Sequence, residues 1–251
     1  DVPLLFFTSI LLWSFSHILF IKNNNLYYLI FCLALALGFM SKYAIIYFVI
    51  SLILAVMVEK NIFIQIKNNF SLSHLFAIFF VFFLLVFNHL QWNYNNSFIT
   101  AQHTFANANI NGEGSGLKSL IKFFLEQFIV FGPLTLVFLL TTLYKYNKLS
   151  TEERTLIFLS FVPILLVMFQ AFISRAHANW AAIAYVPATV LVASQIVKYW
   201  PKTKFIYFGI IIIGVLFAVL IPLSSKHNFG LDPFKKYRGW SDLGSEDRKS
   251  T

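Results

Sequence analysis

The sequence predicts an all-α, polytopic integral membrane protein, organised as a helical bundle with about eight membrane helices. Two observations lead to this prediction. Of the 251 residues, 59% are hydrophobic and only 12% are charged, and the mean hydropathy is +0.74, whereas soluble domains carry roughly a quarter of charged residues. In addition, the apolar residues fall in runs of about 20, the length that a helix needs to cross a bilayer.

Six of these runs are close to the length of one crossing. Lipid offers no hydrogen bonds to the backbone, so such runs are expected to be helices. The predicted crossings are residues 2–21, 72–90, 127–144, 156–173, 181–197 and 205–223. We therefore assign residues 1–223 to a transmembrane domain and residues 224–251 to the start of a periplasmic C-terminal segment.

The stretch 26–58 is too long for one comfortable crossing and is interrupted by the sequence MSKY at residues 40–43. We expect a hairpin of two short helices with Lys42 at its tip. With this hairpin, the loops at 22–25, 59–71, 145–155 and 198–204 fall on one side of the membrane and collect most of the short-loop Lys and Arg residues. Those loops are therefore predicted to be cytoplasmic.

The opposite, outer face is rich in polar and aromatic residues. It contains the MSKY tip, a loop at 91–116, the turn RAHANW at 175–180 and the tail from Ser224. After the long loop, Lys118, Lys122 and Glu126 share one helical face, which predicts an interfacial or solvated helix over 117–126.

Several function classes are disfavoured by the same patterns. The net charge is +9, but the basic residues are scattered between apolar runs, so we expect no nucleic-acid binding. Cys32 is the only cysteine and allows no internal disulfide. The histidines show no metal-ligand spacing, and no metal or other cofactor is predicted.

Lys42 and Arg175 are isolated cations on the face where few are expected. An ammonium beside apolar helices is costly and tends to mark a pathway or an anionic partner. At headgroup depth the natural anion is a lipid phosphate, which Arg and Lys both bind well. The alternatives are that Lys42 snorkels to water and that Arg175 contacts headgroups nonspecifically.

The neighbouring polar and aromatic residues are candidates for sugar and phosphate contacts. His103 and His177 would serve as hydrogen-bond partners of a phosphate or a sugar hydroxyl, or alternatively as structural residues. Trp92 and Trp180 are either sugar platforms or interfacial anchors. Carboxylates are scarce on this face: Asp1, Glu113, Glu126 and the acids of the tail are the candidates. We interpret the sequence, which begins without Met, as an internal fragment from which the principal base is missing.

The outer-face motifs, taken in order, resemble the bacterial glycosyltransferases related to dolichyl-phosphate-mannose protein mannosyltransferases, the GT-C type family that includes the aminoarabinose transferases acting on lipid A. The matching residues are Asp1, Pro3 and Leu4; Gly38, Ser41, Lys42 and Tyr43; Asn88, Trp92, Asn93, Ser97, Phe98 and His103; Gln127, Gly132 and Pro133; Asn179, Trp180, Ala182 and Tyr185; and Gly239, Trp240, Leu243 and Gly244. One departure is Ala181-Ala182, where family members more often carry Pro-Ala.

The resemblance implies a multi-pass enzyme of the bacterial inner membrane that works at the periplasmic face. Such an enzyme transfers a sugar from a polyprenyl-phosphate donor to a hydroxyl of lipid A, a protein or a glycan. Lys42, Arg175 and His103 would bind the donor phosphate, and Asp1 would be a secondary acid. Sugar and lipid contacts would come from Tyr43, Trp92, Asn93, His177, Asn179, Trp180 and Tyr185.

The resemblance also implies that the main catalytic carboxylate lies in an outer loop upstream of residue 1, so the isolated fragment is expected to be inactive. Two other classes remain open from the residues themselves. A transporter or lipid flippase would favour charges near the bilayer midplane and inverted repeats. A noncatalytic membrane scaffold would leave Lys42 and Arg175 without a ligand.

Overall fold

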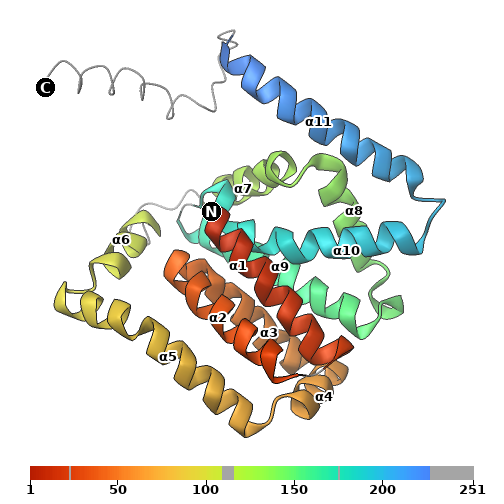
Figure 1. Ribbon diagram of the computed structural model, residues 1–251. Coiled ribbons are helices and arrows are strands. Elements are labelled where there is room, and N and C mark those ends of the chain that lie inside the picture. The colour runs from red at the N-terminus through yellow and green to blue at the C-terminus, as the bar shows by residue number, and fades with distance from the viewer. Residues whose placement is uncertain (23, 109–115, 175, 227–251) are drawn as a thin grey trace, which may run out of the picture. The chain divides into compact units, whose positions relative to one another are not determined.

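The computed structural model describes residues 1–22, 24–108, 116–174 and 176–226, and these residues form helices, turns and loops with no strand among them. The chain divides into two compact units, Asp1–Lys198 and Tyr199–Thr251. The helices of the first unit (Figure 1) are α1 (Val2–Ser16), α2 (Asn25–Ser41), α3 (Ile46–Val58), α4 (Lys60–Asn69), α5 (Leu72–Asn95), α6 (Ile99–Ala108), α7 (Leu117–Val130), α8 (Pro133–Leu143), α9 (Thr151–Ile173) and α10 (Tyr185–Lys198). Short helical turns of other types are η1 (His17–Ile21), η2 (Tyr43–Ile45), η3 (Tyr146–Lys148) and η4 (Ala178–Ala184). The second unit contains α11 (Lys204–Lys226), which covers the crossing predicted at 205–223.

The prediction of an all-α polytopic bundle is confirmed. Among the described residues, four helical stretches are long and apolar enough to cross a membrane, and up to six if each of two bent helix pairs forms one span. The four are residues 2–21, 72–95, 151–173 and 178–198, which match four predicted crossings. The number is below the expected eight because α2 and the apolar stretch Lys204–Leu220 of α11 are short, and because α3 and α7 each belong to a bent helix pair.

The structure differs from the predicted segments at a Gly-Pro pair and in two predicted loops. The crossing expected at 127–144 is divided between α7 and α8, which meet at 111° around Gly132 and Pro133. Gly132 has a φ of +90°, a backbone conformation that glycine adopts without a steric cost. The loop expected at 59–71 contains α4, which turns by 115° from α3. The loop expected at 91–116 begins with the end of α5 and all of α6.

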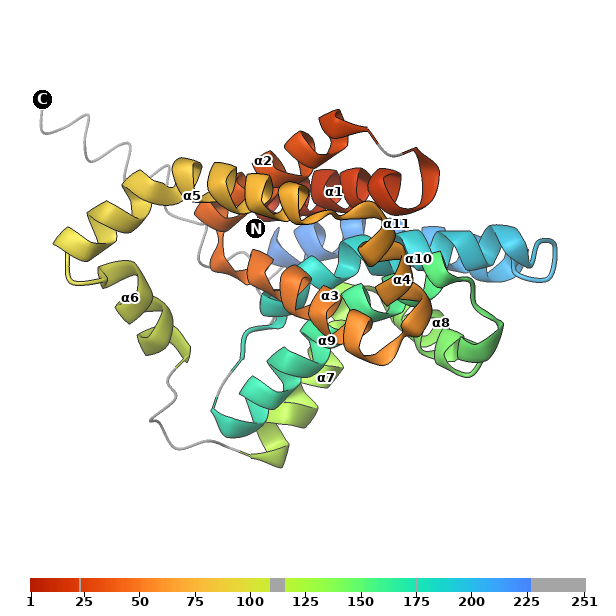
Figure 2. The same ribbon diagram turned by 90° about the horizontal axis from the view of Figure 1, so that it is seen from below.

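Two apolar clusters hold the first unit together. In the larger one, α1 packs against α2, and Phe15, Phe31 and Phe48 bring α1, α2 and α3 together. The smaller cluster joins α7, α9 and η4 through Phe123, Val167 and Ala181. Figure 2 shows α7 beside α9, and α3 also packs on α9. α9 is therefore the helix onto which α3, α7, α10 and η4 pack.

The expected break at MSKY is present and depends on close packing at Gly38. α2 ends at Ser41, Lys42 is extended, and both the Ser41 hydroxyl and the Lys42 backbone N–H donate to the Gly38 carbonyl, at 2.7 and 3.0 Å. A Cβ atom on Gly38 would lie 3.1 Å from Ile45 and 3.3 Å from Phe7. Glycine at this position lets α1 and the chain after the break approach α2 at the same level.

Polar and charged residues of two predicted cytoplasmic loops, 59–71 and 145–155, meet at one place in the fold. Glu59 accepts hydrogen bonds from the Tyr146 hydroxyl at 2.5 Å and from Arg154 Nη1 at 3.1 Å. Arg154 also donates to the backbone carbonyl of Asn147. The grouping of these loops on one side, inferred from their basic residues, is thus compatible with the fold.

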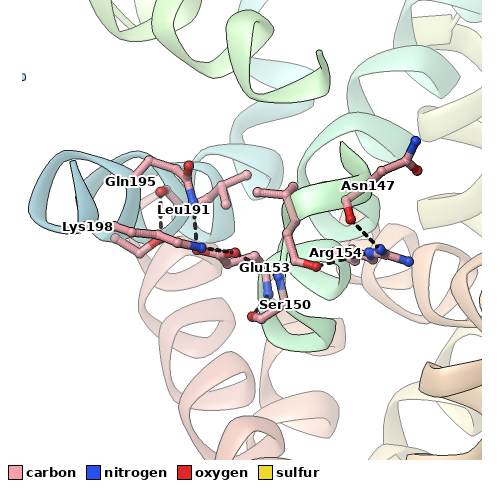
Figure 3. Close-up of polar contacts among 9 residues, drawn as sticks. Asn147, Ser150, Glu153, Arg154, Leu191, Gln195 and Lys198 are labelled. Carbon is pink, nitrogen blue, oxygen red and sulfur yellow. Dashed lines mark hydrogen bonds and ion pairs between the residues drawn. The ribbon is translucent and has the colours of Figure 1, made fainter. Parts of the chain in front are cut away.

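A second ion pair fastens the start of α9 to the end of α10 (Figure 3). Glu153 closes a capping box with Ser150, which satisfies backbone N–H groups at the start of the helix. The same carboxylate accepts from Gln195 at 2.6 Å and from Lys198 at 3.0 Å. Because Glu153 is only 8% exposed, these donors compensate for the loss of its hydration.

Replacing Gly38 by Ala should destabilise the protein. The added methyl group must displace Ile45 or Phe7, and overpacking of this kind costs about 1–3 kcal/mol. We expect a lower midpoint of thermal unfolding, measured by tryptophan fluorescence in detergent. Gly214→Ala is the matched control, because nothing lies within 4 Å of its Cβ position in α11. An equal effect of both substitutions would contradict the packing argument.

Alkaline pH should weaken the contact between Tyr146 and Glu59. Burial raises the pKa of the Tyr146 phenol, and its hydrogen bond to Glu59 raises that pKa further. The stabilisation is therefore fully present below the pKa of an unfolded tyrosine, about 10, and is lost as the pH rises above it. Thermal unfolding midpoints measured between pH 8 and 11 should fall less steeply in Tyr146→Phe than in the parent. Parallel curves would show that Tyr146 does not titrate differently in the folded state.

Candidate functional site

The predicted site is organised around a bridge between three distant parts of the sequence. Lys42 Nζ lies 2.5 Å from Asp1 Oδ1, and Asn179 Nδ2 donates to Asp1 Oδ2 at 2.6 Å. Asp1 precedes α1 but makes no capping bond to it, so its carboxylate is available to Lys42 and Asn179. The structure thereby unites the start of α1, the α2 break and η4.

The bridge is partly open to solvent. The side chains of Lys42 and Asp1 are 31% and 28% exposed. Burial lowers the pKa of the Lys42 ammonium from its ordinary value, while the adjacent carboxylate favours its charged form. An ammonium held in this setting can bind a second anion on its exposed side.

Two cavities open on either side of Lys42 and Tyr43. One has a volume of about 440 Å³ and is lined also by His89, Thr100 and His103. The other has a volume of about 390 Å³ and is lined also by Tyr47, Gln170 and Trp180. Thr104 of α6 lines both cavities. Lys42 is therefore placed where a phosphate in either cavity could reach it.

Tyr43 and Asn93, predicted as sugar or lipid contacts, bond to other side chains. The Tyr43 hydroxyl lies 2.8 Å from His89 Nε2 and 2.7 Å from Thr100 Oγ1. Asn93 is 3% exposed and accepts a hydrogen bond from Thr100. The contacts of His89 and Thr100 with Tyr43 were not predicted from the sequence. The local signal for His89 was that it and Asn93 are polar residues one helical turn apart in an otherwise apolar helix.

The turn that carries Asn179 and Trp180 is held from behind by Gln127. This amide is fully buried, donates to the Ala178 carbonyl at 3.4 Å and accepts from the Tyr185 hydroxyl. Tyr185, predicted to contact the sugar or lipid, is also stacked on Phe131 with ring centroids 4.7 Å apart. Gln127 appeared in the sequence only as a motif residue, and its contacts give it a role in positioning η4.

The other predicted residues are placed less centrally. His177 packs edge-to-face against Trp180 at 5.3 Å. The Trp92 side chain is 51% exposed and lies outside the lining of both cavities. Glu126 pairs with Lys122 at 3.9 Å on the charged face of α7. Arg175, Glu113 and the tail motif Gly239, Trp240, Leu243 and Gly244 lie outside the described residues, as does most of the predicted segment 224–251.

The described part of the chain contains no group of three or more His, Cys, Asp or Glu side chains that could hold a metal ion. Cys32 is buried and donates to the Ile78 carbonyl at 3.2 Å, which is a packing role. The chemistry that this site can supply is therefore that of a lysine, a carboxylate, histidines, amides and aromatic rings.

Sequence comparisons match the chain to a protein family and to a known protein. Residues 1–92 match the family model of dolichyl-phosphate-mannose-protein mannosyltransferases, a stretch that includes Asp1, the break at Lys42 and Trp92. Over 204 residues the chain is 29% identical to the lipid A galacturonosyltransferase RgtD of Rhizobium johnstonii (strain DSM 114642 / LMG 32736 / 3841). This similarity covers 80% of the chain and 42% of that protein, so the chain spans less than half the length of this relative.

No solved structure matches the chain significantly. The two sequence matches together confirm the resemblance, inferred from the motifs, to the GT-C type glycosyltransferases related to dolichyl-phosphate-mannose protein mannosyltransferases.

Proposed function

We propose that the chain is part of a bacterial inner-membrane glycosyltransferase that transfers a sugar from a polyprenyl-phosphate donor to an acceptor hydroxyl at the periplasmic face. The observation that carries this proposal is the bridge of Lys42, Asp1 and Asn179, beside two cavities at the end of apolar helices. The matching family model and the similar protein both carry the names of glycosyltransferases, which favours transfer over the transporter, flippase and scaffold alternatives.

In this proposal Lys42 binds the phosphate of the donor. The acceptor oxygen attacks the anomeric carbon of the sugar, and the bond from that carbon to the phosphate oxygen breaks with its electron pair on the phosphate. A fixed ammonium stabilises the negative charge that develops there, which is where preorganised cations contribute most. His103, in the same cavity as Lys42, would contact the same phosphate, and so would Arg175.

Asp1 is assigned a supporting role. Its two carboxylate oxygens already accept from Lys42 and Asn179, and such bonds stabilise the charged carboxylate and weaken it as a base. The proton of the acceptor hydroxyl therefore goes to a different carboxylate, which we place upstream of residue 1. Trp180 offers an aromatic face to the sugar in the second cavity.

The acceptor is proposed to be lipid A, since the similar curated protein acts on lipid A by its name. An amphipathic acceptor of this kind would reach the cavities from the membrane surface. The transferred sugar is proposed to be a hexose or pentose derivative.

Replacing Lys42 by Met keeps the length of the side chain and removes its charge. In the protein expressed from its complete coding sequence, we expect transfer from a polyprenyl-phosphate sugar to fall by about 100-fold or more, the usual cost of losing one group that stabilises charge in the transition state. Radiolabelled donor and lipid A in proteoliposomes provide the measurement.

Lys60→Met is the matched control, because Lys60 is exposed at the start of α4 and should leave transfer unchanged. Lys42→Met activity within two-fold of the parent, in protein that is inserted normally, would remove Lys42 from the site.

A further inference from the structure

α6 carries His103 to the cavity beside Lys42, although little of the helix is packed. Residues 102–107 are exposed, and only Thr100 and Ala101 at its first turns are partly buried. The chain enters α6 through Ser97 and Phe98, which have positive φ values of 55° and 56°. Such a conformation costs energy for residues with side chains and persists only where the surroundings enforce it.

The surroundings that hold this turn are polar. The Phe98 N–H donates to the Asn93 carbonyl at 2.7 Å, and the Thr100 hydroxyl donates to the Asn93 side-chain oxygen. Tyr43, at the α2 break, reaches both Thr100 of α6 and His89 of α5. The Tyr43 hydroxyl thus connects the α2 break with both α5 and α6.

The direction of one bond follows by elimination. Thr100 gives its only proton to Asn93, so its oxygen accepts from the Tyr43 hydroxyl. The Tyr43 oxygen also lies 2.8 Å from His89 Nε2, and the same ring nitrogen lies 3.2 Å from Asn93 Nδ2. Asn93 returns a bond to the His89 backbone carbonyl at 3.0 Å. The result is a closed set of polar contacts among His89, Tyr43, Thr100 and Asn93.

We infer that Tyr43, His89, Asn93 and Thr100 are positioning residues that fix α6, and with it His103, over the Lys42 cavity for sugar transfer. The role in transfer rests on the proposed function, whereas the fixing of α6 does not. In this assignment Tyr43 and Asn93 bond to other residues of the protein, and Lys42, His103 and Trp180 contact the substrate.

A distance measurement tests the fixing of α6 without using activity. Nitroxide labels at Met40→Cys and Phe105→Cys, both exposed positions, report the separation between the α2 break and α6 by pulsed electron paramagnetic resonance. The protein is expressed from its complete coding sequence, with its other cysteines replaced, and placed in lipid nanodiscs. We expect one narrow distance distribution in this background and a clearly broader one after Tyr43→Phe or Thr100→Val.

The matched controls remove the same groups elsewhere. Tyr144→Phe and Thr141→Val lie at exposed positions and should leave the distribution narrow. Thr100→Ser keeps the hydroxyl and should also leave it narrow. If Tyr43→Phe and Thr100→Val both retain the narrow distribution, the network does not fix α6 and the inference is overturned.

Kinetics of the same variants, without labels, test the role in transfer. Misplacing a binding group by about 1 Å can cost up to 100-fold, so Tyr43→Phe should raise the KM for the polyprenyl-phosphate sugar by about 10-fold or more, with a smaller change in kcat. His89→Gln, which supplies a side-chain amide near the position of Nε2, should recover most of the loss caused by His89→Ala. A broadened distance distribution with unchanged KM would overturn the positioning role. A parent protein that transfers no sugar would instead overturn the proposed function, and the distance result would still decide whether the network fixes α6.

Discussion

The ion pair between Lys42 and Asp1 is the interaction on which the candidate site depends. A lysine at the end of two apolar helices loses hydration, and the carboxylate 2.5 Å away restores a favourable partner. Because Asp1 also accepts from Asn179, the pair draws η4 to the α2 break. The break itself requires Gly38, where a larger residue would press on Ile45 and Phe7. The charge, the break and the close packing of α1 on α2 are therefore one structural unit.

The first unit has a second polar layer at the opposite ends of its helices. Glu59 joins Arg154 and Tyr146, and Glu153 joins Gln195 and Lys198. Between the two layers lie the apolar clusters around Phe15 and Phe123. The two layers have different roles. The layer with Glu59 and Glu153 joins α9 to its neighbours. The layer with Lys42 is partly exposed and adjoins the two cavities. Gln127 and the Tyr43 network then attach η4 and α6, the two elements that carry the remaining candidate residues.

Much of the fold follows from the sequence because membrane crossings are set by length and hydropathy. The crossings at 2–21 and 156–173 and the break at Lys42 were predictable on that basis. The bend at Gly132 and the helices α4 and α6 were not, since short amphipathic segments depend on packing that hydropathy does not describe. For the site, isolated cations and motif order identified Lys42, Asp1 and Asn179, but no local pattern indicated that Asp1 contacts both of the others. The long-range partners of Gln127 and Tyr43 lie 46 to 58 positions away, a separation that requires the fold to be known.

In the proposed function, Lys42 binds a lipid phosphate between the two cavities. The most direct measurement is a cryo-electron microscopy structure of the protein from its complete coding sequence in nanodiscs, with a polyprenyl phosphate added. We expect phosphate density within hydrogen-bond distance of Lys42 Nζ, with Asp1 and Asn179 still joined beside it. A phosphate bound away from Lys42, with Lys42 facing bulk water or lipid headgroups, would contradict it.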